Sequence, residues 1–223
     1  WSSDVCSSDL DYALRMGVQR IVYISSLSVN GKHNNGKPFK PNDKPNPESP
    51  YSRSKLDAEL ALMSSSVPEI FIIRPPRIIW PNLSGSLRIL SLLIAKGVPL
   101  PFGSLTNNSR DNISSHNLIE AIIACINSPY IQREVLLVSN QCPLSTVDLT
   151  RFLGNLVGRE PRLISVPSIL LKTFVSLMPN GVFGKLSPQE LYDELTLDLC
   201  VDISRTTQLT GWKPAHFFDQ EVS

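Results

Sequence analysis

Short apolar runs alternate with longer helix-forming segments along this chain, and this alternation limits its fold most strongly. Residues 21–24, 70–73 and 135–138 are rich in Ile, Val and Leu, which is typical of strands buried in a parallel sheet. Helix-forming or helix-periodic residues occupy 56–63, 87–95 and 117–127. Parallel strands need long crossover connections, and helices usually provide them. The predicted fold class is therefore α/β with a parallel sheet.

Composition narrows the function classes. The 223 residues can form one sizeable core or two small domains. With 21 basic and 20 acidic residues, the chain gives no support for nucleic-acid binding through a basic face. No apolar run reaches the roughly 18 residues of a membrane span, and no signal peptide is recognisable. Four scattered cysteines without a Cys-x-x-Cys favour reduced thiols, so a cytoplasmic protein is expected.

Residues 49–55, Ser-Pro-Tyr-Ser-Arg-Ser-Lys, place a phenol and an ammonium four positions apart at a predicted helix start. Ser49 is a suitable N-cap, and Pro50 suits the first turn, where a missing N–H costs nothing. Residues i and i+4 share a helix face, so Tyr51 and Lys55 can face the same cavity. A neighbouring cation stabilises a phenolate and thereby favours proton transfer near neutral pH. The pair predicts a proton-transferring site for an alcohol or ketone.

A second hydroxyl group is expected near this pair. Ser26 follows the strand predicted over residues 21–24, and open α/β sheets bind ligands at the carboxyl ends of their strands. Each signal has a simpler alternative, because a Tyr-x-x-x-Lys spacing also occurs on helices with a surface lysine. A serine at a strand end can likewise bond only the backbone. We favour the functional interpretation because further motifs accompany these residues.

Those motifs keep one order along the chain. Residues 26–31 read Ser-Leu-Ser-Val-Asn-Gly, residues 50–55 Pro-Tyr-Ser-Arg-Ser-Lys, and residues 73–76 Ile-Arg-Pro-Pro. Residues 110–118 read Arg-Asp-Asn-Ile-Ser-Ser-His-Asn-Leu, and residues 211–214 read Gly-Trp-Lys-Pro. Together they resemble the extended short-chain dehydrogenases/reductases, in particular the NAD-dependent epimerase/dehydratase family that acts on nucleotide sugars. The resemblance covers about residues 11–214, with Asn30 in place of the usual tyrosine of Ser-x-x-Val-Tyr-Gly.

The resemblance implies a Rossmann-type sheet that binds NAD or NADP, together with a smaller α/β substrate-binding lobe. Tyr51 would move the proton, and Lys55 would hold the nicotinamide ribose and tune the phenol. Ser26 would orient the reacting sugar hydroxyl, which completes a catalytic set of Ser26, Tyr51 and Lys55. Pro75 would contact the nicotinamide through its backbone. Arg110 would bind the diphosphate of the substrate.

Other charged residues carry simpler expectations. A surface ion pair, for example with Asp111, is the alternative role for Arg110, and Arg74 is expected to be structural. The lysines between residues 30 and 49 are expected to face solvent, with substrate-phosphate binding as the alternative. The three histidines, at positions 33, 116 and 216, show no ligand spacing, so no metal site is predicted.

The chain lacks one feature of the family it resembles. No Gly-x-x-Gly-x-x-Gly, the turn that cradles the cofactor pyrophosphate, occurs in the 223 residues. We therefore expect an N-terminally truncated chain that is inactive alone. Residues 1–10, which nearly repeat Ser-Ser-Asp and show no helical or strand period, are expected to be non-native. Residues 11–81 would be the C-terminal part of the NAD-binding domain with the Ser-Tyr-Lys site, and residues 82–223 mainly the substrate-binding lobe.

The type of reaction stays partly open. Family dehydratases carry an Asp-Glu pair where this chain has Leu27 and Ser28, so dehydration is disfavoured. Epimerisation and one-way oxidation or reduction of a nucleotide sugar, expected at C4, would use the same Ser26, Tyr51 and Lys55. Two alternatives are an enzyme that acts on a sterol-like alcohol and a non-catalytic dinucleotide sensor. A homodimer of the full-length protein is also considered.

Overall fold

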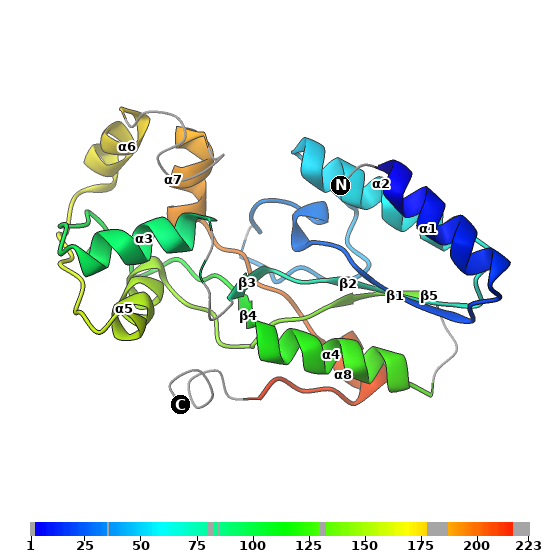
Figure 1. The fold of residues 1–223 in the computed structure, drawn as a ribbon. Helices are drawn as coiled ribbons and strands as arrows, with labels where there is room; N and C mark the ends of the chain where they lie inside the picture. The colour runs from blue at the N-terminus through cyan, green and yellow to red at the C-terminus, as the bar shows by residue number, and fades with distance from the viewer. Residues whose placement is uncertain are drawn as a thin grey trace.

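The computed structural model describes residues 3–34, 36–79, 83, 85–129, 133–177 and 187–215, with side chains from residue 9 onward. Its main sheet contains three parallel strands, β1 (Arg20–Ile24), β2 (Glu69–Arg74) and β5 (Arg133–Leu137), in the order β1-β2-β5. Figure 1 shows the strands side by side at the centre of one half of the molecule. This arrangement confirms the predicted α/β class with a parallel sheet.

Helices cover both faces of the sheet. α1 (Ser3–Arg15) and α2 (Pro50–Ser64) lie on one face, and α4 (Ser115–Asn127) and α8 (Ser204–Thr210) lie on the other (Figure 1). Side chains alternate along β2, so Ile70 and Ile72 pack toward α2 while Phe71 and Ile73 pack toward α4 and α8. These four of the six β2 side chains are fully buried, and each stabilises the fold by about 1.5–3 kcal/mol.

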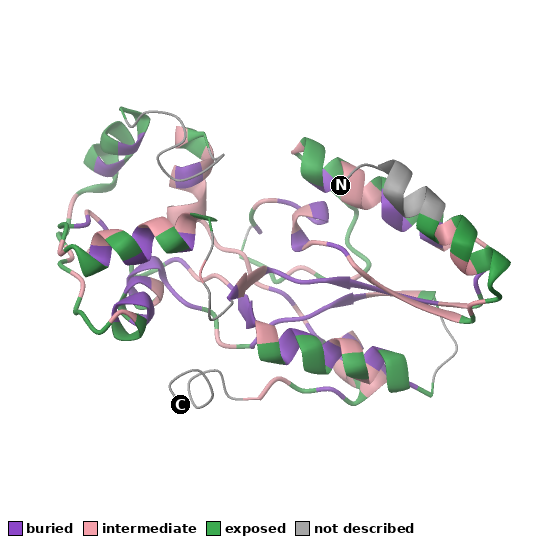
Figure 2. Cartoon of the chain, in the orientation of Figure 1, coloured by how far each residue is buried: buried purple, intermediate pink, exposed green. Residues whose placement is uncertain are grey.

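A second, mainly helical lobe lies beside the sheet. It contains α3 (Gly85–Ala95), α5 (Thr146–Leu156), α6 (Ser168–Ser176) and α7 (Pro188–Thr196) (Figure 1). These helices bury a separate core around Ile94, Leu153 and Leu171. Figure 2 shows buried residues on the inner faces of these helices and exposed residues outside. A short parallel pair, β3 (Arg77–Ile79) and β4 (Asn112–Ser114), lies between the lobe and the sheet.

The segment after residue 82 contributes to both halves. Its helices α3 and α5–α7 form the lobe, whereas β5, α4 and α8 join the sheet. The expected boundary between residues 81 and 82 lies outside the described residues, and the division into domains stays a prediction. In the described part of the chain, each helix is too short or too polar to cross a bilayer.

Two segments differ from the patterns in their sequence. Residues 1–10 show no helical period, yet α1 begins at Ser3 and packs on α2, where Leu10 joins the small core between them. That these residues are non-native stays a prediction. The core stripe predicted for α4, which comprises Leu118, Ile119, Ile122, Ile123 and Ile126, is partly wrong. Leu118, Ala121 and Cys125 are buried, spaced i, i+3 and i+7 along one face. The isoleucines on the remaining surface are exposed, namely Ile119, Ile123 and Ile126.

Candidate functional site

A cavity of about 600 Å³ opens where the carboxyl ends of β1 and β2 face the helical lobe. Its lining includes residues from the loop after β1, the start of α2, the loop after β2 and the segment before β4. Four of the five predicted site residues lie on its wall, namely Ser26, Tyr51, Pro75 and Arg110. These residues are far apart in sequence, and the parallel sheet brings them together because its strands end at the same edge.

The start of α2 positions Tyr51. Ser49 is the N-cap: its Oγ accepts from the backbone N–H of Ser52 at 3.1 Å, and the N–H of Ser49 donates to Ser52 Oγ at 3.0 Å. Pro50 occupies the first turn, as predicted. This reciprocal capping box fixes the first turn of the helix. Tyr51 lies in that turn, lines the cavity and is 55% exposed, so a ligand can reach it.

Ser26 bonds the backbone and also lies on the cavity wall. It caps the short 3₁₀ turn η1 (Leu27–Val29), because its Oγ accepts from the N–H of Ser28 at 3.2 Å. The hydroxyl groups of Ser26 and Ser28 also lie 2.9 Å apart. Both serines line the cavity. The turn therefore holds a hydroxyl in place at the cavity wall while it bonds the backbone.

Lys55 lies on the β1 side of α2, outside the set of residues that line the cavity. Its Nζ donates to the carbonyl of Ile24 at 2.9 Å and to the Tyr23 hydroxyl at 3.3 Å. The ammonium also lies 4.9 Å from the centroid of the Tyr23 ring. These contacts tie α2 to the end of β1. An effect of Lys55 on Tyr51 stays a prediction.

Arg74 has a structural role, in agreement with expectation. It is 3% exposed, and its Nε donates to Glu59 Oε1 at 2.9 Å while its Nη1 donates to Asn30 Oδ1 at 2.9 Å. The Ser25 hydroxyl donates to the same Glu59 carboxylate. Asn30, which replaces the tyrosine usual in the resembled motif, thus helps to hold a buried ion pair between α2 and β2.

Arg110 reaches the cavity from a fixed backbone. Its N–H and carbonyl both pair with Leu144, and its Nη1 donates to the carbonyl of Leu197 at 2.9 Å. Burial lowers the pKa of Arg110 to about 10, so the guanidinium remains charged at neutral pH. Asp111 instead accepts from the N–H of Val201 at 2.9 Å, and burial raises its pKa. None of the ion pairs among the described residues includes Arg110, although the charge of Asp198 raises its pKa; the alternative role of an ion pair thus lacks a contact here.

The cavity wall also carries charged residues that the sequence either did not predict at the site or predicted to face solvent. Arg77 on β3 forms an ion pair with Glu194 on α7. Lys32, expected to face solvent, lines the cavity. Its Nζ lies 3.0 Å from Oε1 of Glu190, which is on α7 like Glu194. The sequence Ser-Pro-Gln-Glu at 187–190 is a capping-box pattern that could have predicted the start of α7. No comparable local signal marks Arg77.

Comparisons with known proteins show the family of the chain. The model of the NAD dependent epimerase/dehydratase family matches residues 10–134. The UDP-glucose 4-epimerase of Vibrio cholerae is 39% identical over 206 residues, which cover 91% of this chain and 60% of that protein. The chain thus spans about three fifths of the length of this relative.

Solved structures share the fold at lower identity. UDP-glucuronic acid 4-epimerase from Bacillus cereus, in complex with NAD, matches with a TM-score of 0.67 and 20% identity over 95% of this chain and 61% of its own. The Bordetella bronchiseptica enzyme WbmG, in complex with NAD and UDP, matches with a TM-score of 0.68 and 16% identity over 94% of this chain and 58% of its own. By its matched residues and its fold, the chain belongs to the NAD-dependent epimerase/dehydratase family.

Proposed function

We propose that the protein carrying this chain uses NAD to epimerise, or to oxidise or reduce, one ring carbon of a nucleotide sugar, with C4 as the expected position. Family membership and the similarity to a UDP-glucose 4-epimerase support this proposal. The observation that carries it is the common cavity of Ser26, Tyr51, Pro75 and Arg110. A base, an orienting hydroxyl and a phosphate-binding cation thereby face one space large enough for a ligand.

Each residue has a separate task in this proposal. The Tyr51 phenol exchanges a proton with the reacting sugar hydroxyl, and Ser26 Oγ hydrogen-bonds the same oxygen and orients it. Lys55 fixes the start of α2 against β1 through the Ile24 carbonyl and contributes positive charge near the phenol. Arg110 binds the diphosphate, since a planar guanidinium matches phosphate oxygens. NAD, when bound, supplies the acceptor for the hydride that leaves the sugar carbon.

The residues of this chain fit only one end of the cofactor. Tyr51 and the Pro75 backbone lie on one wall, where a nicotinamide would meet the sugar. The pyrophosphate end of NAD needs a glycine-rich turn at a helix N-terminus, and no Gly-x-x-Gly-x-x-Gly occurs in residues 1–223. We therefore propose that these residues alone do not turn over substrate.

The test is a product analysis with the full-length protein. UDP-glucose and UDP-N-acetylglucosamine, and separately their 4-epimers, are incubated with NAD and followed by proton NMR. Interconversion of a 4-epimer pair without net NADH supports an epimerase, whereas stoichiometric NADH supports one-way oxidation. A protein that converts none of the four sugars and whose melting temperature UDP does not raise would contradict the proposal.

A further inference from the structure

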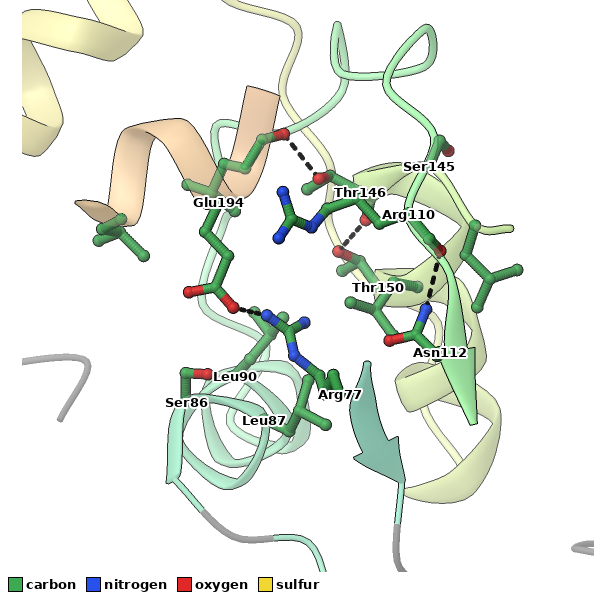
Figure 3. A pocket seen from close by; sticks show the side chains of 14 residues that line it. Arg77, Ser86, Leu87, Leu90, Arg110, Asn112, Ser145, Thr146, Thr150 and Glu194 are labelled. Atoms are coloured by element: carbon green, nitrogen blue, oxygen red, sulfur yellow. Dashed lines mark hydrogen bonds and ion pairs between the residues drawn. The ribbon is translucent and has the colours of Figure 1, made fainter. Parts of the chain in front are cut away.

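Two arginines lie at one boundary of the cavity. Arg77 on β3 and Arg110 just before β4 both line the large cavity and a smaller adjoining pocket of about 40 Å³. The β3–β4 pairing explains their proximity, because Arg77 is opposite Asn112 and Arg110 is two residues before it. Figure 3 shows both guanidinium groups facing the same space, with Glu194 bonded to Arg77.

The charged forms of both arginines are less favourable here than in water. Burial, and after it the neighbouring charge of Arg110, lower the pKa of Arg77 to about 10. Burial also lowers the pKa of Arg110. Two positive charges that are partly removed from water at close range favour an anion between them. The arrangement therefore suits a ligand with more than one negative charge.

The protein supplies only part of the compensating charge. Glu194 pairs with Arg77, and both side chains retain about a quarter of their exposure. Arg110 bonds the neutral carbonyl of Leu197 and takes part in none of the ion pairs recorded for the described residues. Arg77 is thus balanced by a carboxylate that a ligand can reach, while Arg110 is influenced by the charge of Asp198 but forms no ion pair with it among the described residues.

We propose that Arg77 is a second binding residue for the diphosphate of the nucleotide sugar, and that Glu194 holds Arg77 until the diphosphate replaces it. This inference rests on the proposed function. Two guanidinium forks match the two phosphate groups of a diphosphate, and a bidentate phosphate contact is stronger than a partly exposed ion pair. Glu194 is therefore a competitor of the ligand for Arg77.

The test compares variants of the full-length protein by isothermal titration with UDP and with uridine. Arg77→Gln should weaken UDP binding by roughly tenfold or more, since it removes a charged hydrogen bond to the ligand. Glu194→Gln should tighten UDP binding by roughly two- to fivefold, because it removes the competitor. Asp193→Asn is the matched control: Asp193 lies beside Glu194 on α7 and lines the same cavity, but it contacts Gln189. Uridine, which lacks phosphate, should bind all variants alike.

Each result bears on a separate claim. Unchanged or weaker UDP binding by Glu194→Gln overturns the exchange, and this variant decides the matter even if Arg77→Gln does not fold. Wild-type affinity in Arg77→Gln, together with a loss in Arg110→Gln, overturns the role of Arg77 and leaves the proposed function intact. Failure of the wild-type protein to bind UDP at all contradicts the proposed function as well.

Discussion

At the scale of single residues, a buried polar cluster lies directly behind the candidate site. Arg74 and Glu59, each 3% exposed, pair between β2 and α2; Asn30 accepts a further bond from Arg74, and Ser25 donates one to Glu59. A structural role for Arg74 could be predicted from the sequence. Its partner could not, because Glu59 belongs to a helix whose buried face is set only by packing on the sheet.

Replacing Glu59 by Gln tests this cluster. The change removes the charge that compensates the buried Arg74 guanidinium, and an uncompensated buried charge costs about 3–5 kcal/mol. We expect the free energy of unfolding, measured by urea denaturation, to fall by roughly that amount. The control is Glu120→Gln on the exposed surface of α4, which should change it by less than about 0.5 kcal/mol. Equal losses in the two variants would show that the ion pair does not stabilise the fold.

At the scale of elements, the helix ends and strands could be predicted from local sequence signals, whereas tertiary contacts could not. The capping residues of α2 and α5, the buried run of β2 and the glycines that end α1, α3 and α5 could be recognised because each signal lies within a few residues. The buried face of α4 was predicted wrongly in part. Hydrophobicity identifies which residues can be buried, but the sheet selects Leu118, Ala121 and Cys125 over the neighbouring isoleucines.

Ser49→Ala tests the capping box that positions Tyr51. Loss of the Ser49 hydroxyl leaves the N–H of Ser52 without its partner, which costs about 1 kcal/mol. We expect a corresponding decrease in the free energy of unfolding, measured by thermal and chemical denaturation. Ser64→Ala, at the exposed other end of α2, is the control and should have little effect. The cap would be unimportant if both variants were as stable as the wild type.

At the scale of the whole molecule, the cavity lies between the sheet and the helical lobe, and α7 closes one side. The ion pairs of Arg77 with Glu194 and of Lys32 with Glu190 join α7 to the sheet side. The order of motifs predicted five residues at one site, and four of them, Ser26, Tyr51, Pro75 and Arg110, line the cavity. The ion pairs were not predictable, since Lys32 and Glu190 are separated by 158 residues and no local pattern connects them.

The pair of Lys32 and Glu190 should make stability depend on pH. The N–H of Ser187 and then the Lys32 ammonium lower the pKa of Glu190 from 4.5 to about 2. Because the folded value lies below the unfolded one, the carboxylate stabilises the fold above about pH 4.5 and loses this effect as the pH falls toward about 2. The hydrogen bond to Glu190 raises the pKa of Lys32, so the lysine remains charged throughout this range.

Glu190→Gln keeps a residue suited to the capping box and removes the charge. The pair is partly exposed, so we expect a loss of at most about 1 kcal/mol at pH 7, seen as a lower melting temperature by calorimetry. The difference from the wild type should narrow as the pH is lowered from about 4.5. A difference that stays constant over this range would exclude the charge of Glu190 as its cause.

The most direct test of the account is the effect of Tyr51→Phe on turnover and on ligand binding in the full-length protein. The variant lacks only the phenolic hydroxyl at the cavity wall, so conversion of the UDP-sugar should fall by at least about a hundredfold. Binding of UDP, measured by titration, should remain close to that of the wild type because Arg110 is unchanged. Wild-type turnover by Tyr51→Phe would contradict proton transfer by this residue and, with it, the proposed site.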